Sequence, residues 1–127
     1  MKKLVDTNIF LEILLDQPAR PKCEAFLDNN EDAAGISDFS LHSLGVLLFR
    51  KNRAELFRRF VSDTLPELSV LTLSNPGYLG LVEARDKFGL DFDDAYQFCV
   101  AKESGLSLAT QDKDFLRVGK ELQITFI

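Results

Sequence analysis

The chain has 127 residues, of which 46% are hydrophobic, and this length suits a single domain, residues 1–127, with its own buried core. Its two cysteines are too few for a disulfide framework, and its apolar runs are shorter than the roughly twenty residues of a membrane span, so we expect a protein of the reducing cytoplasm. A formal net charge of −5 argues against a protein that coats nucleic acid through bulk electrostatics, but it is compatible with a nuclease whose acidic pocket holds metal.

Short apolar runs typical of strands alternate with helical patterns along the chain. The first strand, residues 3–5, stops at Asp6, and apolar residues then recur at helical spacing from Ile9 to Leu14. The elements expected after it are a helix at residues 21–27, a strand at 33–36, a helix capped by Ser37, a helix at 54–65, a strand at 70–73, helices at 78–88 and 91–104, a strand at 106–110, a short helical segment or loop at 112–118 and a last strand at 124–127. Gly105 is a favoured residue for ending the helix before it.

This alternation predicts an α/β fold, a three-layer α/β/α sandwich with a mostly parallel five-stranded sheet. Ligands of such sheets bind outside the carboxyl ends of the strands. Asp6 follows the first strand, Asp112 follows the strand that ends near Thr110, and acids at residues 91–94 open the helix before that strand. We therefore expect three acidic sites to converge at one edge of the sheet.

Each acid also has a purely structural interpretation. Asp6 and Asp94 lie where an acid complements the dipole at the start of a helix, and Asp112 and Asp114 could be solvated turn residues. Asp91 and Asp94 are three residues apart, so we expect them to share a helical face, where like charges repel unless a cation lies between them. The expected buried face of that helix contains Phe92, Ala95, Phe98 and Cys99.

Taken together, the acids indicate a metal site. Carboxylate oxygens are the hard ligands that Mg²⁺ and Mn²⁺ prefer. Such an ion can activate a water molecule for attack on phosphorus and shield the charge of the phosphate. This chemistry needs several aspartates and no histidine, which suits a chain whose only histidine is His42.

Two segments resemble a known family. Leu-Val-Asp-Thr-Asn-Ile-Phe at residues 4–10 resembles the opening of PIN domains, the fold of VapC-type toxin ribonucleases in bacterial and archaeal toxin–antitoxin pairs. Leu-Asp-Phe-Asp-Asp-Ala at residues 90–95 and the run Leu-Ala-Thr-Gln-Asp-Lys-Asp-Phe at 108–115 resemble the family's C-terminal half. In order and spacing, the resemblance covers essentially the whole chain.

The resemblance implies roles for particular residues. Asp6, Asp94 and Asp112 would be the catalytic acids that bind metal. The polar groups expected to orient carboxylates or water are Thr7, Asn8 and Thr110. Asp91, Asp93 and Asp114 rank below them, with Asp91 and Asp114 as accessory acids. The family also implies an RNA substrate, a homodimer and a small antitoxin protein that covers the site.

The chain departs from the family pattern at one acid. Family members carry a glutamate on the helix after the second strand, and the corresponding position here is Ser43, with His42 beside it. Neither side chain is a carboxylate. Asp38 lies about one turn earlier on the same helix and could act as an accessory acid, although a role at the helix N-terminus explains it more simply.

The main hypothesis is a Mg²⁺- or Mn²⁺-dependent endoribonuclease that hydrolyses RNA phosphodiester bonds as the toxin of a toxin–antitoxin pair. The alternative is a weakly active or inactive PIN-fold interaction module that lacks the family glutamate, and a metal titration would distinguish the two. A receiver domain of a two-component system is a third hypothesis. It expects adjacent early acids and an acceptor aspartate after a mid-chain strand, but Asp6 has no acidic neighbour and the strand at 70–73 ends without an aspartate.

Overall fold

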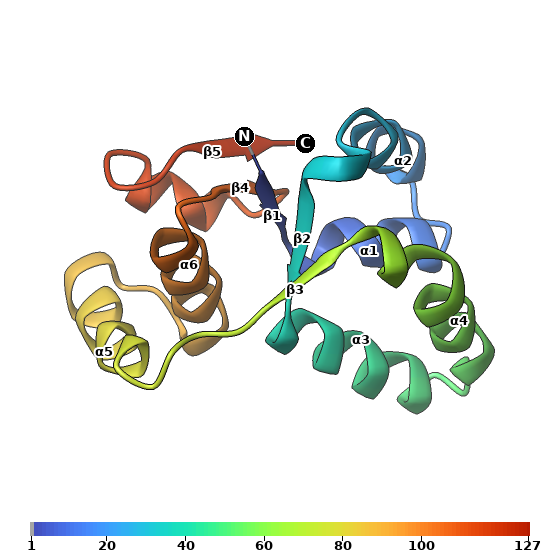
Figure 1. The fold of residues 1–127 in the computed structure, drawn as a ribbon, viewed down its shortest axis with the longest axis horizontal. Helices are drawn as coiled ribbons and strands as arrows, with labels where there is room; N and C mark the ends of the chain where they lie inside the picture. The colour runs from blue at the N-terminus through green and yellow to red at the C-terminus, as the bar shows by residue number, and fades with distance from the viewer. Residues whose placement is uncertain (1) are drawn as a thin grey trace.

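A computed structural model describes residues 2–127 and shows a five-stranded sheet between two layers of helices (Figure 1). The strands lie in the order β3-β2-β1-β4-β5, and all four pairings are parallel. Their bounds are β1 Lys3–Val5, β2 Ala34–Ser37, β3 Ser69–Leu71, β4 Ser107–Thr110 and β5 Ile124–Phe126. The predicted α/β/α architecture is confirmed.

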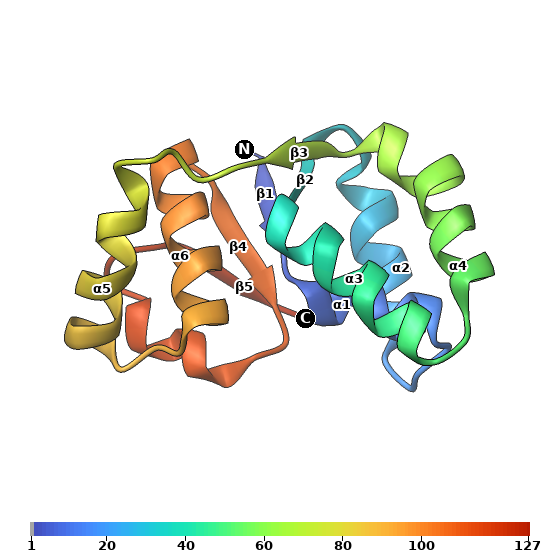
Figure 2. The ribbon, with the colours of Figure 1, turned by 90° about the horizontal axis from the view of Figure 1, so that it is seen from below.

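The helices divide between the two faces of the sheet. Helices α1 to α4 lie on one side and helices α5 and α6 on the other, as Figures 1 and 2 show. Their bounds are α1 Thr7–Leu14, α2 Arg20–Asn29, α3 Asp38–Arg50, α4 Ala54–Arg59, α5 Gly77–Phe88 and α6 Phe92–Ser104. Shorter helical turns are η1 Glu31–Ala33, η2 Phe60–Thr64, η3 Leu65–Glu67 and η4 Lys113–Val118.

Each face of the sheet has its own apolar core because successive strand residues point to opposite faces. Leu4 and Leu108 belong to the core under α5 and α6. Val5 and Ala109, the next residues of the same two strands, belong to the core under α1 to α4. Cys23 and Cys99 are both buried, and both are free thiols.

Helix ends follow local sequence signals closely. The Ser37 hydroxyl accepts a hydrogen bond from the backbone N–H of Ser40 and caps α3, as predicted. Gly105 ends α6 with a positive φ of 69°, a conformation that costs glycine little. The Ser37 cap lies beside the candidate site, whereas Gly105 is at the end of α6 opposite to Asp94.

Three expectations need correction. The helix expected at residues 54–65 is α-helical only to Arg59 and continues as a π-helical turn. Asp91 is the N-cap of α6 rather than a helical residue, so it does not share a helical face with Asp94. Phe92, expected on the buried face, is 59% exposed. It is the first residue of α6, and its ring stacks on the buried Tyr96 from the solvent side.

Candidate metal centre

The candidate site lies where three central strands end. Strands β2, β1 and β4 are neighbours in the sheet, and all run in the same direction. Asp38 follows β2, Asp6 follows β1, and Thr110 is the last residue of β4. The parallel arrangement therefore brings side chains more than a hundred residues apart to one edge of the sheet, the edge at which such sheets bind ligands.

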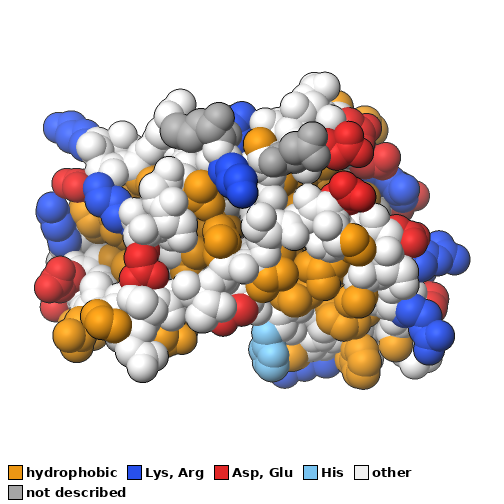
Figure 3. Space-filling view, viewed as in Figure 1, with side chains coloured by type: hydrophobic (Ala, Val, Ile, Leu, Met, Phe, Trp, Pro, Cys, Tyr) orange, Lys and Arg blue, Asp and Glu red, His pale blue; other side chains and the backbone are white. Residues whose placement is uncertain are grey.

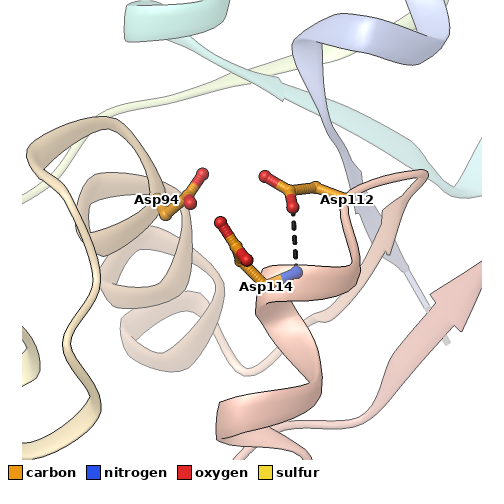
Figure 4. A group of neighbouring side chains, drawn as sticks. All are labelled: Asp94, Asp112 and Asp114. Atoms are coloured by element: carbon orange, nitrogen blue, oxygen red, sulfur yellow. Dashed lines mark hydrogen bonds between the residues drawn. The ribbon is translucent and has the colours of Figure 1, made fainter.

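Three carboxylates face one another beside this edge. Asp94, Asp112 and Asp114 each offer an oxygen, and these oxygens lie within 4.8 Å of one another. Figure 4 shows Asp94 on α6 pointing toward the two acids at the start of η4. The backbone N–H of Asp114 donates a hydrogen bond of 2.9 Å to the Asp112 carboxylate, which caps that turn. Asp114, expected only as an accessory acid, thus belongs to the cluster.

The cluster disfavours negative charge on Asp94. Partial burial, followed by the charge of Asp112 and then by Asp91, Asp6 and Asp114, raises the pKa of Asp94 from 3.8 to about 7. The Asp94 carboxylate accepts no hydrogen bond from the rest of residues 2–127 that would offset this cost. A divalent cation would offset the cost of a negative charge on Asp94. Three hard oxygen donors at this separation fit Mg²⁺ or Mn²⁺.

Asp6 lies behind the cluster and is held firmly. Its side chain is buried, and both carboxylate oxygens accept hydrogen bonds. One oxygen accepts from the backbone N–H of Thr7 at 2.8 Å and from Nε2 of Gln97 at 3.0 Å. The other accepts from the hydroxyl of Thr110 at 2.6 Å. Asp6 is outside the group of three oxygens, but it is close enough that its charge raises the pKa of Asp94.

The three polar residues expected to orient the acids differ in their contacts. Thr110 donates to Asp6 and also accepts from the backbone N–H of Asp112 at 3.0 Å, so it ties two acids together. The Thr7 hydroxyl instead pairs with the Ser40 hydroxyl at 2.7 Å. The amide oxygen of Asn8 is buried without a hydrogen-bond partner among the described residues.

Two of the expected accessory acids are occupied by other contacts. The Asp38 carboxylate accepts from the Tyr96 hydroxyl at 2.7 Å and from the backbone N–H of Phe39 at 2.8 Å. The Asp91 carboxylate accepts from the backbone N–H of Asp94 at 2.9 Å and caps α6. Asp38 and Asp91 therefore bond to other groups of the protein, and neither belongs to the cluster of three acids in Figure 4.

Sequence reasoning missed a buried amide next to Asp6. Gln97 is 1% exposed, and its amide contacts Asp6, Ser37 and Ser40. One sequence signal could have found it, because Gln97 is the only amide in the otherwise apolar or aromatic run Ala-Tyr-Gln-Phe-Cys-Val-Ala at residues 95–101, all of which the structure buries. A polar side chain that is buried in such a run needs hydrogen-bond partners, so its partners merit a search.

Comparison with known families gives a decisive match. A family model for the PIN domain matches residues 3–121. The chain belongs to the PIN domain family. The site described above thus lies in a PIN domain whose acids at Asp6, Asp94 and Asp112 occupy the ends of β1, α6 and β4.

Solved structures with the same fold include several toxin–antitoxin proteins. FitAcB from Neisseria gonorrhoeae is 23% identical, with a TM-score of 0.80 over 97% of this chain and 96% of that chain. VapBC2 from Rickettsia felis, solved with a promoter DNA fragment, is 17% identical, with a TM-score of 0.82 over 99% and 98%. VapC20 from Mycobacterium tuberculosis, a toxin that cleaves the sarcin-ricin loop, is 17% identical, with a TM-score of 0.75 over 93% and 95%. A comparison with curated protein sequences gave no match.

Within residues 2–127, no helix has the length and apolar character needed to cross a bilayer.

Proposed function

We propose that this PIN domain is a Mg²⁺- or Mn²⁺-dependent endoribonuclease and the toxin of a toxin–antitoxin pair. It would act in the cytoplasm, with residues 1–127 forming one domain. The observation that carries the proposal is the cluster of Asp94, Asp112 and Asp114, with Asp6 held by hydrogen bonds behind it. Membership of the PIN family and the fold shared with VapC20, a toxin that cleaves the sarcin-ricin loop, support the same conclusion.

Each acid has a distinct part in this proposal. Asp94, Asp112 and Asp114 would hold the metal, and Asp6 would add negative charge from a carboxylate that three hydrogen bonds keep in one orientation. The bound ion would supply an activated water molecule and shield the charge of the phosphate. Thr110 keeps Asp6 and the backbone of Asp112 together, so the donors are arranged before the ion arrives.

Cleavage of an RNA substrate tests the enzymatic proposal. We expect cleavage with Mn²⁺ or Mg²⁺, none in EDTA, and none for Asp94→Asn with either ion, because the amide keeps the shape of the carboxylate but loses its charge. Asp86→Asn is a matched control on α5, where the Asp86 side chain is 63% exposed. Full activity of Asp94→Asn, or undiminished activity in EDTA, would refute the proposal.

The surface supports a protein partner. A hollow on α3 and α4 is lined by apolar side chains next to the single histidine, and Figure 3 shows hydrophobic side chains gathered beside it. Phe49 in this hollow is 65% exposed. We propose that an antitoxin covers part of such an apolar surface and that the chain forms homodimers. Size-exclusion chromatography with light scattering tests the dimer, and a monomer at micromolar concentration would contradict it.

A second candidate function is an interaction module that does not cleave RNA. The substitution of Ser43 for the family glutamate and the exposed apolar hollow favour it. A calorimetric titration with Mn²⁺ distinguishes the two candidates. A folded protein that does not bind Mn²⁺ at millimolar concentration would favour the module.

A further inference from the structure

Gln97 on α6 is a buried side chain near the site whose amide nitrogen and oxygen both have hydrogen-bond partners. Its Nε2 donates to Asp6 at 3.0 Å and to the Ser40 hydroxyl at 2.7 Å. Its Oε1 accepts from the Ser37 hydroxyl at 2.7 Å. Both N–H groups of the amide are therefore used, and the oxygen has a partner. Burying an amide is costly unless it is satisfied in this way.

Chemistry fixes the orientation of this amide. An ionised carboxylate only accepts hydrogen bonds, so the nitrogen of Gln97 must face Asp6 and its oxygen must face Ser37. The Ser37 hydroxyl gives its single proton to Gln97 and accepts from the backbone N–H of Ser40. The Ser40 hydroxyl accepts from Gln97, which leaves its own proton for Thr7.

The hydrogen bonds extend beyond the amide in both directions. Toward η4 they run from Asp6 through the Thr110 hydroxyl to the backbone of Asp112. Toward α3 they reach Ser37, the N-cap of that helix, and Ser40 in its first turn. Gln97 therefore lies where α6, α3 and the ends of β1 and β4 are joined, and it is on the same helix as Asp94.

We propose that Gln97 is a positioning residue of the metal centre, which holds the Asp6 carboxylate and links it to helix α3. This inference rests on the proposed metal site and concerns how that site is built. Helix α3 has Ser43 where the family has a glutamate, so in this chain α3 supports the site through hydroxyl groups and the Gln97 amide. Gln97 is not a metal ligand, because the nitrogen facing Asp6 is a donor and the oxygen is bonded to Ser37.

Titration with Mn²⁺ measures the effect directly. Gln97→Met keeps the length of the side chain but removes every hydrogen bond of the amide. We expect Mn²⁺ affinity to fall about tenfold, the lower end of the effect of losing a hydrogen-bond partner that orients the groups around a metal. Gln123→Met is the matched control, because Gln123 is exposed and precedes β5. Equal affinity of Gln97→Met and the unaltered protein would overturn the proposal.

A double-mutant cycle separates positioning from a general structural role. If Gln97 acts through Asp6, Gln97→Met should weaken Mn²⁺ binding little further when Asp6→Asn is already present. A second loss of about tenfold in that background would mean that Gln97 acts independently of Asp6, and the proposal would fail.

Folding and the underlying metal site have their own tests. If Gln97→Met does not fold, Ser40→Ala removes the hydroxyl that holds the other N–H of the same amide. We expect Ser40→Ala to lose affinity for Mn²⁺ to a smaller extent, and unchanged affinity would overturn the proposal. If the unaltered protein binds no Mn²⁺, the metal site itself is refuted. If it binds and the variants bind equally, only the role of Gln97 is refuted.

Discussion

At the scale of single residues, the protonation of Asp94 links the stability of the metal-free protein to pH. Its pKa in the folded protein is raised to about 7 from 3.8. A raised acid pKa means that the folded state holds the proton more tightly than the unfolded chain does. The contribution of Asp94 to the free energy of unfolding of the metal-free protein therefore falls as pH rises from about 4 to about 7, and this contribution stays low above that range.

Asp94→Asn should relieve this cost. Without metal at pH 8, we expect the variant to melt at or above the temperature of the unaltered protein, because the buried charge is gone. At pH 5 the advantage should shrink, since Asp94 is then largely protonated in the folded state. Thermal melts by circular dichroism in EDTA at both pH values measure this. A variant that melts well below the unaltered protein at pH 8 would assign Asp94 a structural role.

Asp91 should behave in the opposite way, because it caps α6. Asp91→Ala should lower the free energy of unfolding by about 1 kcal/mol, with or without metal, through the loss of the cap. Asp91→Asn is the control, since asparagine caps helices as well as aspartate does. Urea unfolding of the three proteins provides the comparison. A large loss of Mn²⁺ affinity in Asp91→Asn, without a change in stability, would make Asp91 a ligand instead.

At the scale of elements, the first two turns of α3 decide what that helix contributes. Ser40 faces Gln97 and Thr7 from α3, and Ser43 lies three residues further along, on the same side of the helix. His42, next to Ser43, is exposed and lines the apolar hollow instead. A carboxylate introduced at Ser43 should thus point toward the acids, whereas one at His42 should not.

Ser43→Glu should consequently tighten Mn²⁺ binding and raise RNA cleavage. His42→Glu adds the same charge on the other side of α3 and serves as the control. We expect the gain in affinity for Ser43→Glu alone, measured by calorimetric titration. An equal gain in the control would mean that the added negative charge acts at long range. No gain in either variant would mean that the metal site of this chain does not use α3.

At the scale of the whole molecule, metal binding and folding are linked, because the acids come together only in the folded state. Asp6, Asp94 and Asp112 lie on three separate elements of the chain. A ligand that binds only the folded form adds about 2.7 kcal/mol when present at a hundred times its dissociation constant. The melting temperature should therefore report the integrity of the site.

At about pH 7.5, millimolar Mn²⁺ should raise the melting temperature of the unaltered protein, because the ion binds the folded form. It should raise that of Asp94→Asn much less, because one of the three clustered carboxylates is missing. Differential scanning fluorimetry with EDTA and then with Mn²⁺ gives both shifts. Equal shifts in the two proteins would place the ion elsewhere.

The elements of this fold could largely be predicted, because they depend on local patterns. The strand before Asp6, the cap at Ser37 and the glycine after α6 are encoded by neighbouring residues, and the structure has all three. The prediction was less accurate where tertiary contacts compete with local pattern. The helix expected up to residue 65 becomes a π-helical turn at Phe60, whose ring packs against Phe10 of α1.

The sequence by itself determined which strands end in acids, and hence that a parallel sheet would gather carboxylates at one edge. Tertiary structure decided which acids face one another: Asp114 joins Asp94, while Asp91 caps a helix. It also decided that Gln97 meets Ser37, 60 residues away. Such choices depend on how α6 packs against the sheet and α3, and side-chain hydrogen bonds across that distance leave no periodic signal in the sequence.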